Sequence, residues 1–409
     1  MEQTKIKTMF FKFLQNTFAY ALPIFMQQFI MYPIIADKLG ASKNGLFLSL
    51  LAINYFTINI TVSVLVNTRL LQNEKYKEKQ YVGDYNLILL LFVFINILIV
   101  TVGTIFYTGR TATKTDIILS IVLIVLMIYH DYITVQYRIE LKFNKILINN
   151  IFLCLGYVIG LILFSNIIMY WQIVFIVAYG ITFIYDMLNT NYIREPLKVT
   201  PLMRDTLHQY FLLMASTLLT TAVTYGDRLL LYPILDGTSV SVFSSAQLIG
   251  KMMQMLSTPI TTFVLAYLVR KDEMRITIRL KTIGYSILGL VVLYVACIIV
   301  SYPMIRFLYP GWAEESLKYV RITALNGIIL MLAVIINVFV LRFCDKRYQI
   351  IKSAIYLVTY LGFSFGLVKI MGLWGFCFGN LISAVFQLIY LIFILLKKQL
   401  IKIQILEKK

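Results

Sequence analysis

Charged residues are scarce in this sequence. Lys, Arg, Asp and Glu together make up 14% of the 409 residues, whereas hydrophobic residues make up 60%. Soluble domains are usually about a quarter charged. Many segments here reach the ~20 apolar residues that cross a bilayer as a helix. We therefore expect an integral membrane protein.

Cysteine is also sparse, and no two of the four Cys form a CxxC pair. Their scattered positions in or beside apolar segments fit neither a disulfide framework nor a metal site. We therefore expect no metal and no cofactor. Acidic residues are outnumbered 19 to 37 by Lys and Arg, which gives a net charge of +18. In a membrane protein this surplus faces anionic inner-leaflet lipids, so we expect no nucleic-acid partner.

Strand-like alternation is missing from the apolar segments, and a chain in lipid must satisfy its backbone internally, which demands helices. The expected fold class is an all-α polytopic membrane protein with twelve transmembrane helices in two parallel six-helix lobes. The expected spans cover residues 10–36, 44–68, 85–107, 115–137, 145–166, 170–192, 207–235, 239–268, 276–302, 316–343, 350–369 and 373–396.

The distribution of basic residues predicts the orientation. With the N-terminus inside, 8 of the 37 Lys and Arg fall in outer segments and 2 inside spans, which leaves 27 in inner segments. This asymmetry follows the positive-inside rule and places both termini in the cytoplasm. The first apolar stretch shows no small-residue cleavage site, so we expect it to be retained as a helix.

A weak internal repeat divides the chain. Residues 31–35 read MYPII and residues 231–235 read LYPIL, 200 positions apart, and each stretch ends the first span of its half. A connection at 193–206 contains two prolines and lies at the midpoint. The expected domains are therefore 1–205 and 206–409, as parallel repeats. The same offset places Gln27 and Gln28 opposite Asp227 and Arg228.

Polar residues recur inside the spans, where they usually face the protein interior or a water-filled cavity. Lys251 lies roughly 18 Å from the outer start of its span at 1.5 Å per residue. Asp227 lies roughly 12 Å from the outer end of its own span. The stripe around Lys251 has spacings of 3 and 4, which place its members on one helical face. That stripe contains Ser244, Gln247, Lys251, Gln254 and Thr258.

Structural roles remain open for these residues. Asp227 and Arg228 point about 100° apart on a helix, so they cannot easily pair with each other. Arg228 could extend toward the interface, and Asp227 could cap a neighbouring helix. Packing or interface roles are favoured for His130, Asp131 and Asp186. The functional alternative is a cationic cavity between the halves, in which Arg and Lys attract a phosphate or an acidic sugar.

The stretch TYGDRLLLYPILDGTSVSVFSSAQLIGKMMQMLSTPI resembles the seventh and eighth helices of bacterial polysaccharide flippases. These are the Wzx-type O-antigen and capsule transporters of the MATE-like MOP superfamily. The family pattern matches here at Asp227, Arg228, Phe243, Ser257 and Pro259. The first-helix ending LPIFMQQFIMYPIIADKLGASKNGLF is also similar. One departure is that Ser241 or Val242 stands where the family usually has a Gly.

The resemblance implies a flippase of the bacterial cytoplasmic membrane, with no catalytic residues. It would move an undecaprenyl-diphosphate-linked oligosaccharide between leaflets by alternating access, among membrane lipids and in possible partnership with polysaccharide polymerase machinery. Arg228 and Lys251 would contact the diphosphate or an acidic sugar, and Asp227 would couple transport to an ion or proton gradient. Hydrogen bonds to sugar hydroxyls would come from Gln27, Gln28, Asn54, Gln247 and Gln254.

Two other functions are compatible with parts of the sequence. A cation-coupled MATE multidrug exporter would use acidic residues in the N-terminal lobe, where only Asp131 and Asp186 qualify, and the deep charge of the other lobe is Lys251. A membrane-embedded polysaccharide polymerase or glycosyltransferase would need reactive groups at a membrane surface. The outer loops are too short for a soluble domain, and the longest, 302–315, contains no His.

Overall fold

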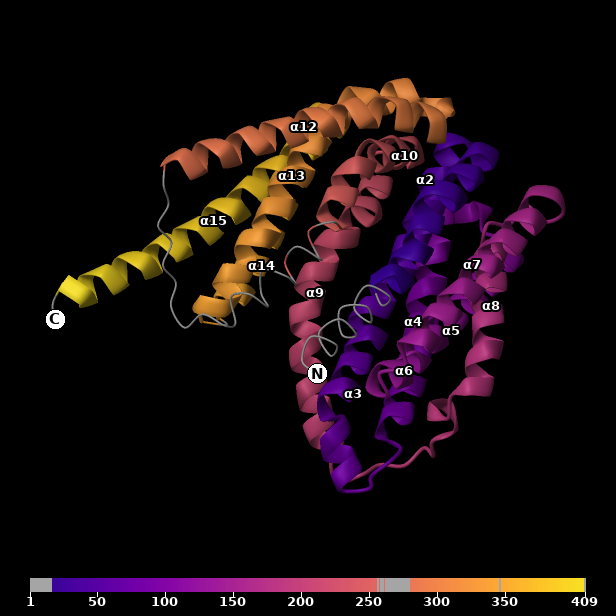
Figure 1. Ribbon diagram of the computed structural model, residues 1–409. Coiled ribbons are helices and arrows are strands. Elements are labelled where there is room, and N and C mark those ends of the chain that lie inside the picture. Colours follow the sequence, from indigo (N-terminus) through magenta and orange to yellow (C-terminus); the bar gives the residue numbers. More distant parts are fainter. Residues whose placement is uncertain (1–16, 256, 258–260, 262–279, 346, 408–409) are drawn as a thin grey trace. The chain divides into compact units, whose positions relative to one another are not determined.

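The computed structural model describes residues 17–255, 257, 261, 280–345 and 347–407 (Figure 1). Every regular element in that part of the chain is a helix. The chain divides into two compact units, Met1–Gly237 and Thr238–Lys409, which we name the N-terminal unit and the C-terminal unit. Each is described here by itself.

The described residues contain 9 helices that are long and apolar enough to cross a membrane. One of them is a 62-residue stretch, Thr17–Glu78, that covers residues 17–36 of the first expected span and the whole of the second. The predicted all-α membrane fold class is therefore confirmed, while the total of twelve spans stays a prediction.

The helices of the N-terminal unit are α2 (Tyr32–Ile60), α3 (Val62–Glu78), α4 (Asp84–Thr108), α5 (Lys114–Ile133), α6 (Val135–Ile139), α7 (Phe143–Asn166), α8 (Gln172–Asn189) and α9 (Met203–Ile234).

The helical stretch Thr17–Glu78 is interrupted near Gln27 and at Gly40. A π-helical turn, η1 (Gln27–Met31), precedes α2, and the Tyr32 N–H donates to the carbonyl oxygen of Gln27. The turn follows Pro23, whose ring removes a backbone donor from the helix. Within α2, Gly40 has φ of 73° and marks a kink. This left-handed conformation favours glycine, so the sequence places it where the first span turns into the second.

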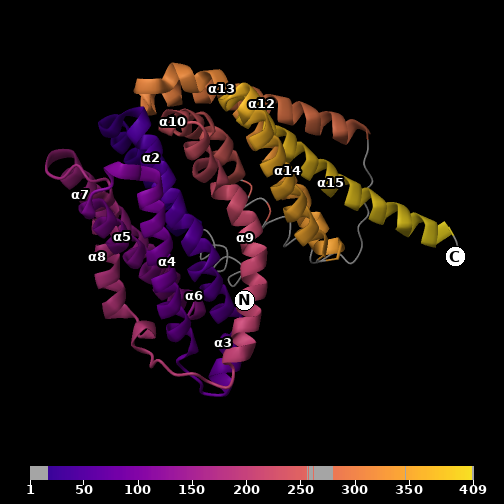
Figure 2. The same ribbon diagram turned by 180° about the vertical axis from the view of Figure 1, so that it is seen from behind.

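Small residues bring α7 and α8 into close contact, and both views show these helices side by side (Figures 1 and 2). A Cβ at Gly156 would lie 2.4 Å from the Cα of Ala178, and one at Gly160 would lie 2.7 Å from the Cα of Val174. Close backbone approach at small residues is a common way for helices to associate in lipid, where no hydrophobic force favours it.

The connection between α8 and α9 is fastened to the start of α4. The Asp84 carboxylate is buried and accepts hydrogen bonds from the Tyr76 hydroxyl at 2.6 Å and from the Thr200 backbone N–H at 2.7 Å. Gly83 has φ of 129°, and a Cβ there would meet the carbonyl oxygen of Pro196 at 2.7 Å. The proline-containing connection therefore follows a defined path along the N-terminal unit.

Arg69 of α3 holds the same connection from the other side. Its guanidinium pairs with Glu195 at 2.5 Å and stacks over the Tyr192 ring at 3.6 Å from the centroid. Tyr132 accepts a further hydrogen bond from this guanidinium at 2.5 Å. The guanidinium thus combines ring stacking with one hydrogen bond from each terminal nitrogen.

By its contacts α9 packs on α2 and α3 and belongs to the N-terminal compact unit. The sequence repeat assigns the same residues to the second half, from 206 onward. The unit on which a helix packs and the half of the repeat to which its sequence belongs are separate properties. The lobe boundary at 205/206 therefore stays a prediction.

The C-terminal unit is built from helices that pack in the same manner. Both views show α14 (Arg347–Met371) beside α15 (Leu373–Glu407) (Figures 1 and 2). A Cβ at Gly379 would lie 2.4 Å from the Cα of Ser364, and one at Gly375 would lie 2.0 Å from the carbonyl oxygen of Leu367. Glycine contacts thus join the fifth and sixth expected spans of each half. The other helices are α10 (Gly237–Ala246), α12 (Leu280–Leu308), η4 (Pro310–Trp312) and α13 (Ala313–Phe343).

Replacing Gly156 by Ala should destabilise the protein by about 1–3 kcal/mol, because the added methyl group overpacks the α7–α8 contact. Gly180 of α8 is the matched control, since a Cβ there meets no atom within 4 Å. The measurement is the fraction of detergent-purified protein that stays monodisperse after heating. Equal midpoints for Gly156→Ala and Gly180→Ala would show that this contact does not determine stability.

Candidate functional site

Gln27 lies at the centre of a group of tyrosine hydroxyls in the N-terminal unit. Its side-chain NH2 donates to the Tyr157 hydroxyl of α7 at 2.7 Å, and its Oε1 lies 3.5 Å from the hydroxyls of Tyr32 and Tyr55. The Tyr55 ring stacks on Tyr225 of α9 with centroids 6.1 Å apart. The π-helical turn that begins at Gln27 therefore places a polar side chain against α2 and α7, and the Tyr55 ring links this group to α9.

Arg228 lies on α9 next to this group. Its guanidinium lies within electrostatic range of Tyr32 and Tyr225. The Ser49 hydroxyl of α2 donates to the backbone carbonyl of Arg228 at 3.1 Å, which fixes that part of α9 against α2. The Nε of Arg228 is buried and makes no hydrogen bond within the described residues. We name Gln27, Tyr32, Tyr55, Tyr157, Tyr225 and Arg228 the arginine–tyrosine cluster.

The arginine–tyrosine cluster combines a cation with several hydroxyl groups in a low-dielectric setting. Arginine presents five donors in a planar fork that matches the oxygens of a phosphate or carboxylate. An unused buried donor is costly unless a partner satisfies it. The arrangement is therefore suited to binding an anion that carries hydroxyl groups.

Three other predicted residues lie in the same unit. Asp227 is buried, and its Oδ1 accepts a hydrogen bond from the backbone N–H of Arg228 at 2.8 Å. Gln28 is half-buried on the π-helical turn. Asn54 of α2 is buried, and its Oδ1 makes no hydrogen bond to the described residues. The structure thus brings Gln27 and Arg228 to one cluster and leaves a second unused polar atom at Asn54.

The remaining predicted residues lie in the C-terminal unit. The Gln247 N–H donates to the carbonyl of Phe243 at 3.0 Å, and the Lys251 N–H donates to the carbonyl of Gln247 at 2.9 Å. These helical bonds keep Gln247 and Lys251 on one face, and Gln254 follows one turn later. All three side chains are half-buried, as expected for a polar stripe. Thr258 and Pro259 lie outside the described residues.

A second polar centre was not identified as a site from the sequence. Asp186 of α8 is 0% exposed and accepts hydrogen bonds from the Tyr137 hydroxyl at 2.9 Å and from the Asn149 side chain at 2.9 Å. The His130 Nδ1 lies 3.8 Å from the same carboxylate. These partners are 37 to 56 residues apart from Asp186 in the chain, so only the fold brings them together. The one available signal was an acidic residue inside an apolar span.

Neither the family models nor the curated proteins contain a match to this chain. Solved structures do match. A multidrug resistance MATE family transporter of the MOP superfamily in an inward-facing conformation aligns with a TM-score of 0.62 at 13% identity, over 92% of this chain and 97% of that one. The lipid II flippase MurJ in an inward closed conformation aligns with a TM-score of 0.61 at 17% identity, over 97% and 87%.

A third match, MATE in complex with MaL6, has a TM-score of 0.57 at 14% identity and covers 97% of each chain. Identities this low establish a shared fold and leave substrate and mechanism undetermined. The chain therefore has the helical membrane fold of MOP-superfamily transporters along nearly its whole length.

Asp186→Ala should lower stability by about 1–3 kcal/mol, because the Tyr137 hydroxyl and the Asn149 amide lose their buried acceptor. Asp37→Ala removes an exposed carboxylate from α2 in the same unit and should leave stability unchanged. The check is thermal unfolding of both purified variants in one detergent. Equal unfolding midpoints would mean that the Asp186 hydrogen bonds contribute nothing to folding.

Proposed function

We propose that this protein is a flippase that carries an undecaprenyl-diphosphate-linked oligosaccharide across the bacterial cytoplasmic membrane by alternating access. The observation that supports it best is Arg228, a half-buried cation within the expected span 207–235. Its buried Nε has no hydrogen bond within the described residues. The fold shared with MATE transporters and with a lipid II flippase is consistent with this function.

The chemistry of the cluster fits a glycan attached to a diphosphate. The Arg228 guanidinium would take two phosphate oxygens at once. The hydroxyls of Tyr32 and Tyr55 and the amide of Gln27 would then replace water around the first sugar, and tyrosine rings would cover its apolar face. Asn54 has an unused carbonyl oxygen that could accept from a sugar hydroxyl.

A diphosphate carries more than one negative charge, so we assign Lys251 as a second cation that contacts it during translocation. Gln247, Gln254 and Gln28 would supply further hydrogen bonds. Alternating access would bring the diphosphate to Arg228 and Lys251 in turn. Each state would then compensate part of the cost of moving a charged group through a low-dielectric region.

We also propose the lobe boundary at 205/206 and an orientation with both termini in the cytoplasm. The matching MYPII and LYPIL segments support the boundary, and the surplus of Lys and Arg in the inner segments supports the orientation. A flippase oriented in this way would deliver its product to an outer-face polysaccharide polymerase.

A second candidate function is a cation-coupled exporter, which the Asp186 centre favours. A fully buried carboxylate in the N-terminal unit is suited to binding a cation or a proton. Export of a cationic dye that Asp186→Asn abolishes and Arg228→Gln leaves intact would favour this function over lipid flipping.

Arg228→Gln and Lys251→Gln should each lower the initial flipping rate roughly tenfold or more, the effect of losing a hydrogen bond to a charged group. The assay is translocation of a labelled polyprenyl-diphosphate oligosaccharide in vesicles reconstituted with equal amounts of folded protein. Arg204→Gln is the control, because it removes an exposed charge from the same helix α9. Full rates for both test variants would overturn the proposed role of these cations.

Asp227→Asn should weaken the dependence of transport on a proton gradient, because the amide cannot exchange a proton. The measurement is the ratio of flipping rates with and without a pH difference across the vesicle membrane. A ratio that falls to about one supports coupling through Asp227, and an unchanged ratio assigns Asp227 to packing on α9.

A further inference from the structure

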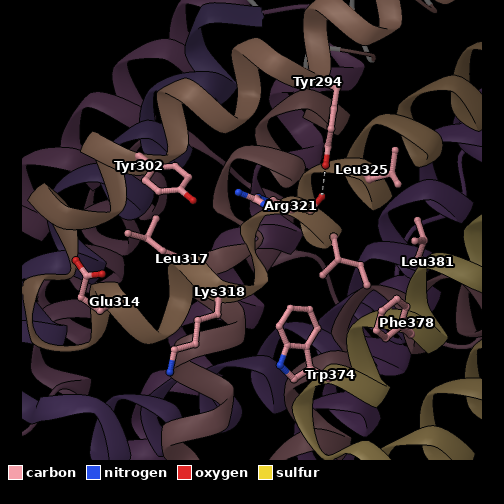
Figure 3. Close-up of a pocket in the computed structure, with 11 residues that line it drawn as sticks. Tyr294, Tyr302, Glu314, Leu317, Lys318, Arg321, Leu325, Trp374, Phe378 and Leu381 are labelled. Carbon is pink, nitrogen blue, oxygen red and sulfur yellow. Dashed lines mark hydrogen bonds between the residues drawn. The ribbon is translucent and has the colours of Figure 1, made fainter.

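The C-terminal unit contains a cavity of about 700 Å³ that none of the predicted site residues lines. It lies between α12, α13 and α15 (Figure 3). A ring contact and a hydrogen bond join the three helices around the cavity. The rings of Tyr319 and Trp374 lie 4.7 Å apart, and the Tyr294 hydroxyl of α12 donates to the backbone carbonyl of Arg321 at 3.2 Å.

The two helices that form most of this cavity run in the same direction. Tyr319 contacts Trp374 near their starts, and further along Ala333 and Val340 share a buried cluster with Leu391 and Ile394. Both helices therefore begin at one end of the unit and proceed together. A position counted from the start of either helix is then a measure of depth.

Along α13 the two cations that line the cavity come before the apolar residue Leu325. Lys318 and Arg321 lie roughly 8 and 12 Å from the start of α13, whereas Leu325 lies roughly 18 Å from it. Figure 3 shows the same separation across the cavity. Tyr302, Glu314 and Lys318 gather on one side, Leu325, Phe378 and Leu381 on the other, with Arg321 between them.

The polar side has an excess of positive charge. Glu314 is the one acidic residue that lines the cavity, and Arg306 pairs with its carboxylate at 2.9 Å. Lys318 and Arg321 form no ion pair within the part of the chain described by the structure. Both side chains are exposed, so their charges are available to an incoming anion.

The apolar side determines which anion fits. A soluble phosphate would use the two cations and leave Leu325, Phe378 and Leu381 unused. A lipid would place its phosphate at Lys318 and Arg321 and its chain along the apolar residues. Trp374 is 38% exposed at the boundary, the location where indole rings settle in membranes. A cavity of this volume holds a headgroup and the first part of one chain.

We propose that this cavity is a binding site for the phosphate-bearing headgroup of a membrane lipid, separate from the arginine–tyrosine cluster. Lys318 and Arg321 contact the phosphate, and the apolar side holds the attached chain. In the orientation expected from the charge distribution, the site opens to the outer leaflet. The site does not depend on the proposed flippase activity, since any anionic lipid of that leaflet has the required chemistry.

Native mass spectrometry of the full-length protein tests the site. The protein is mixed with phosphatidylglycerol, polyprenyl phosphate or phosphatidylcholine, and the retained lipid is counted. Wild type should retain one anionic lipid in preference to phosphatidylcholine. Lys318→Ala combined with Arg321→Ala should reduce this retention roughly tenfold to thirtyfold, the effect of two basic residues near a lipid surface.

The matched control is Arg347→Ala combined with Lys369→Ala, which removes two exposed charges from α14 of the same unit. It should retain the lipid as wild type does. Lys318→Arg combined with Arg321→Lys should also retain it, which excludes misfolding as the cause of the loss. Millimolar inorganic phosphate should not displace the lipid, because it cannot use the apolar side.

Three outcomes would overturn the proposal: equal retention of phosphatidylcholine, full retention by the double alanine variant, or displacement by inorganic phosphate. Preference between the two anionic lipids then identifies the occupant. Stronger retention of polyprenyl phosphate indicates a lipid carrier, and stronger retention of phosphatidylglycerol indicates a bulk membrane lipid. Loss of lipid retention with unchanged flipping would separate this site from the proposed transport function.

Discussion

A polar group within a bilayer must find its hydrogen-bond partner inside the protein, and this constraint organises the N-terminal unit. Asp186, inside an expected span, shows it satisfied, and Asp84 and Arg69, at the ends of expected spans, are paired in a similar way. Each is buried and receives or donates several bonds from tyrosine, threonine or asparagine side chains. Such fully paired groups fix one arrangement of the surrounding helices. They explain how an interior with this many polar residues can remain stable.

Buried polar atoms that lack a hydrogen bond do not fix an arrangement of the helices as the paired groups do. The Nε of Arg228 and the Oδ1 of Asn54 are buried without a hydrogen bond among the described residues. An unmade bond of this kind costs free energy unless another molecule completes it. The Asp186 carboxylate accepts hydrogen bonds from Tyr137 and Asn149, whereas the Arg228 Nε has no acceptor among the described residues. This difference is the reason to expect a structural role for the first group and a ligand for the second.

Sequence patterns predicted what depends on local spacing. Apolar runs and the absence of alternation gave the all-α membrane class, and a 3–4 spacing placed Gln247 and Lys251 on one helical face. They did not predict the π-helical turn at Gln27, because the position of a π-bulge depends on packing as well as on Pro23. The Asp186 centre and the Asp84 contacts join residues far apart in the chain. Such contacts follow from the tertiary fold alone.

The two cationic regions differ in the ligand that each can accept. Arg228 lies among tyrosine hydroxyls and amides, which can replace the water around a sugar or phosphate but give no surface to a long hydrocarbon chain. Lys318 and Arg321 border an apolar surface formed by Leu325 and Phe378, which a headgroup alone would leave uncovered. A lipid with a large polar group needs both kinds of environment, because its chain stays in the hydrocarbon while its headgroup moves. The two regions thus differ in chemistry: one suits an anion that carries hydroxyl groups, and the other suits a phosphate that carries an apolar chain.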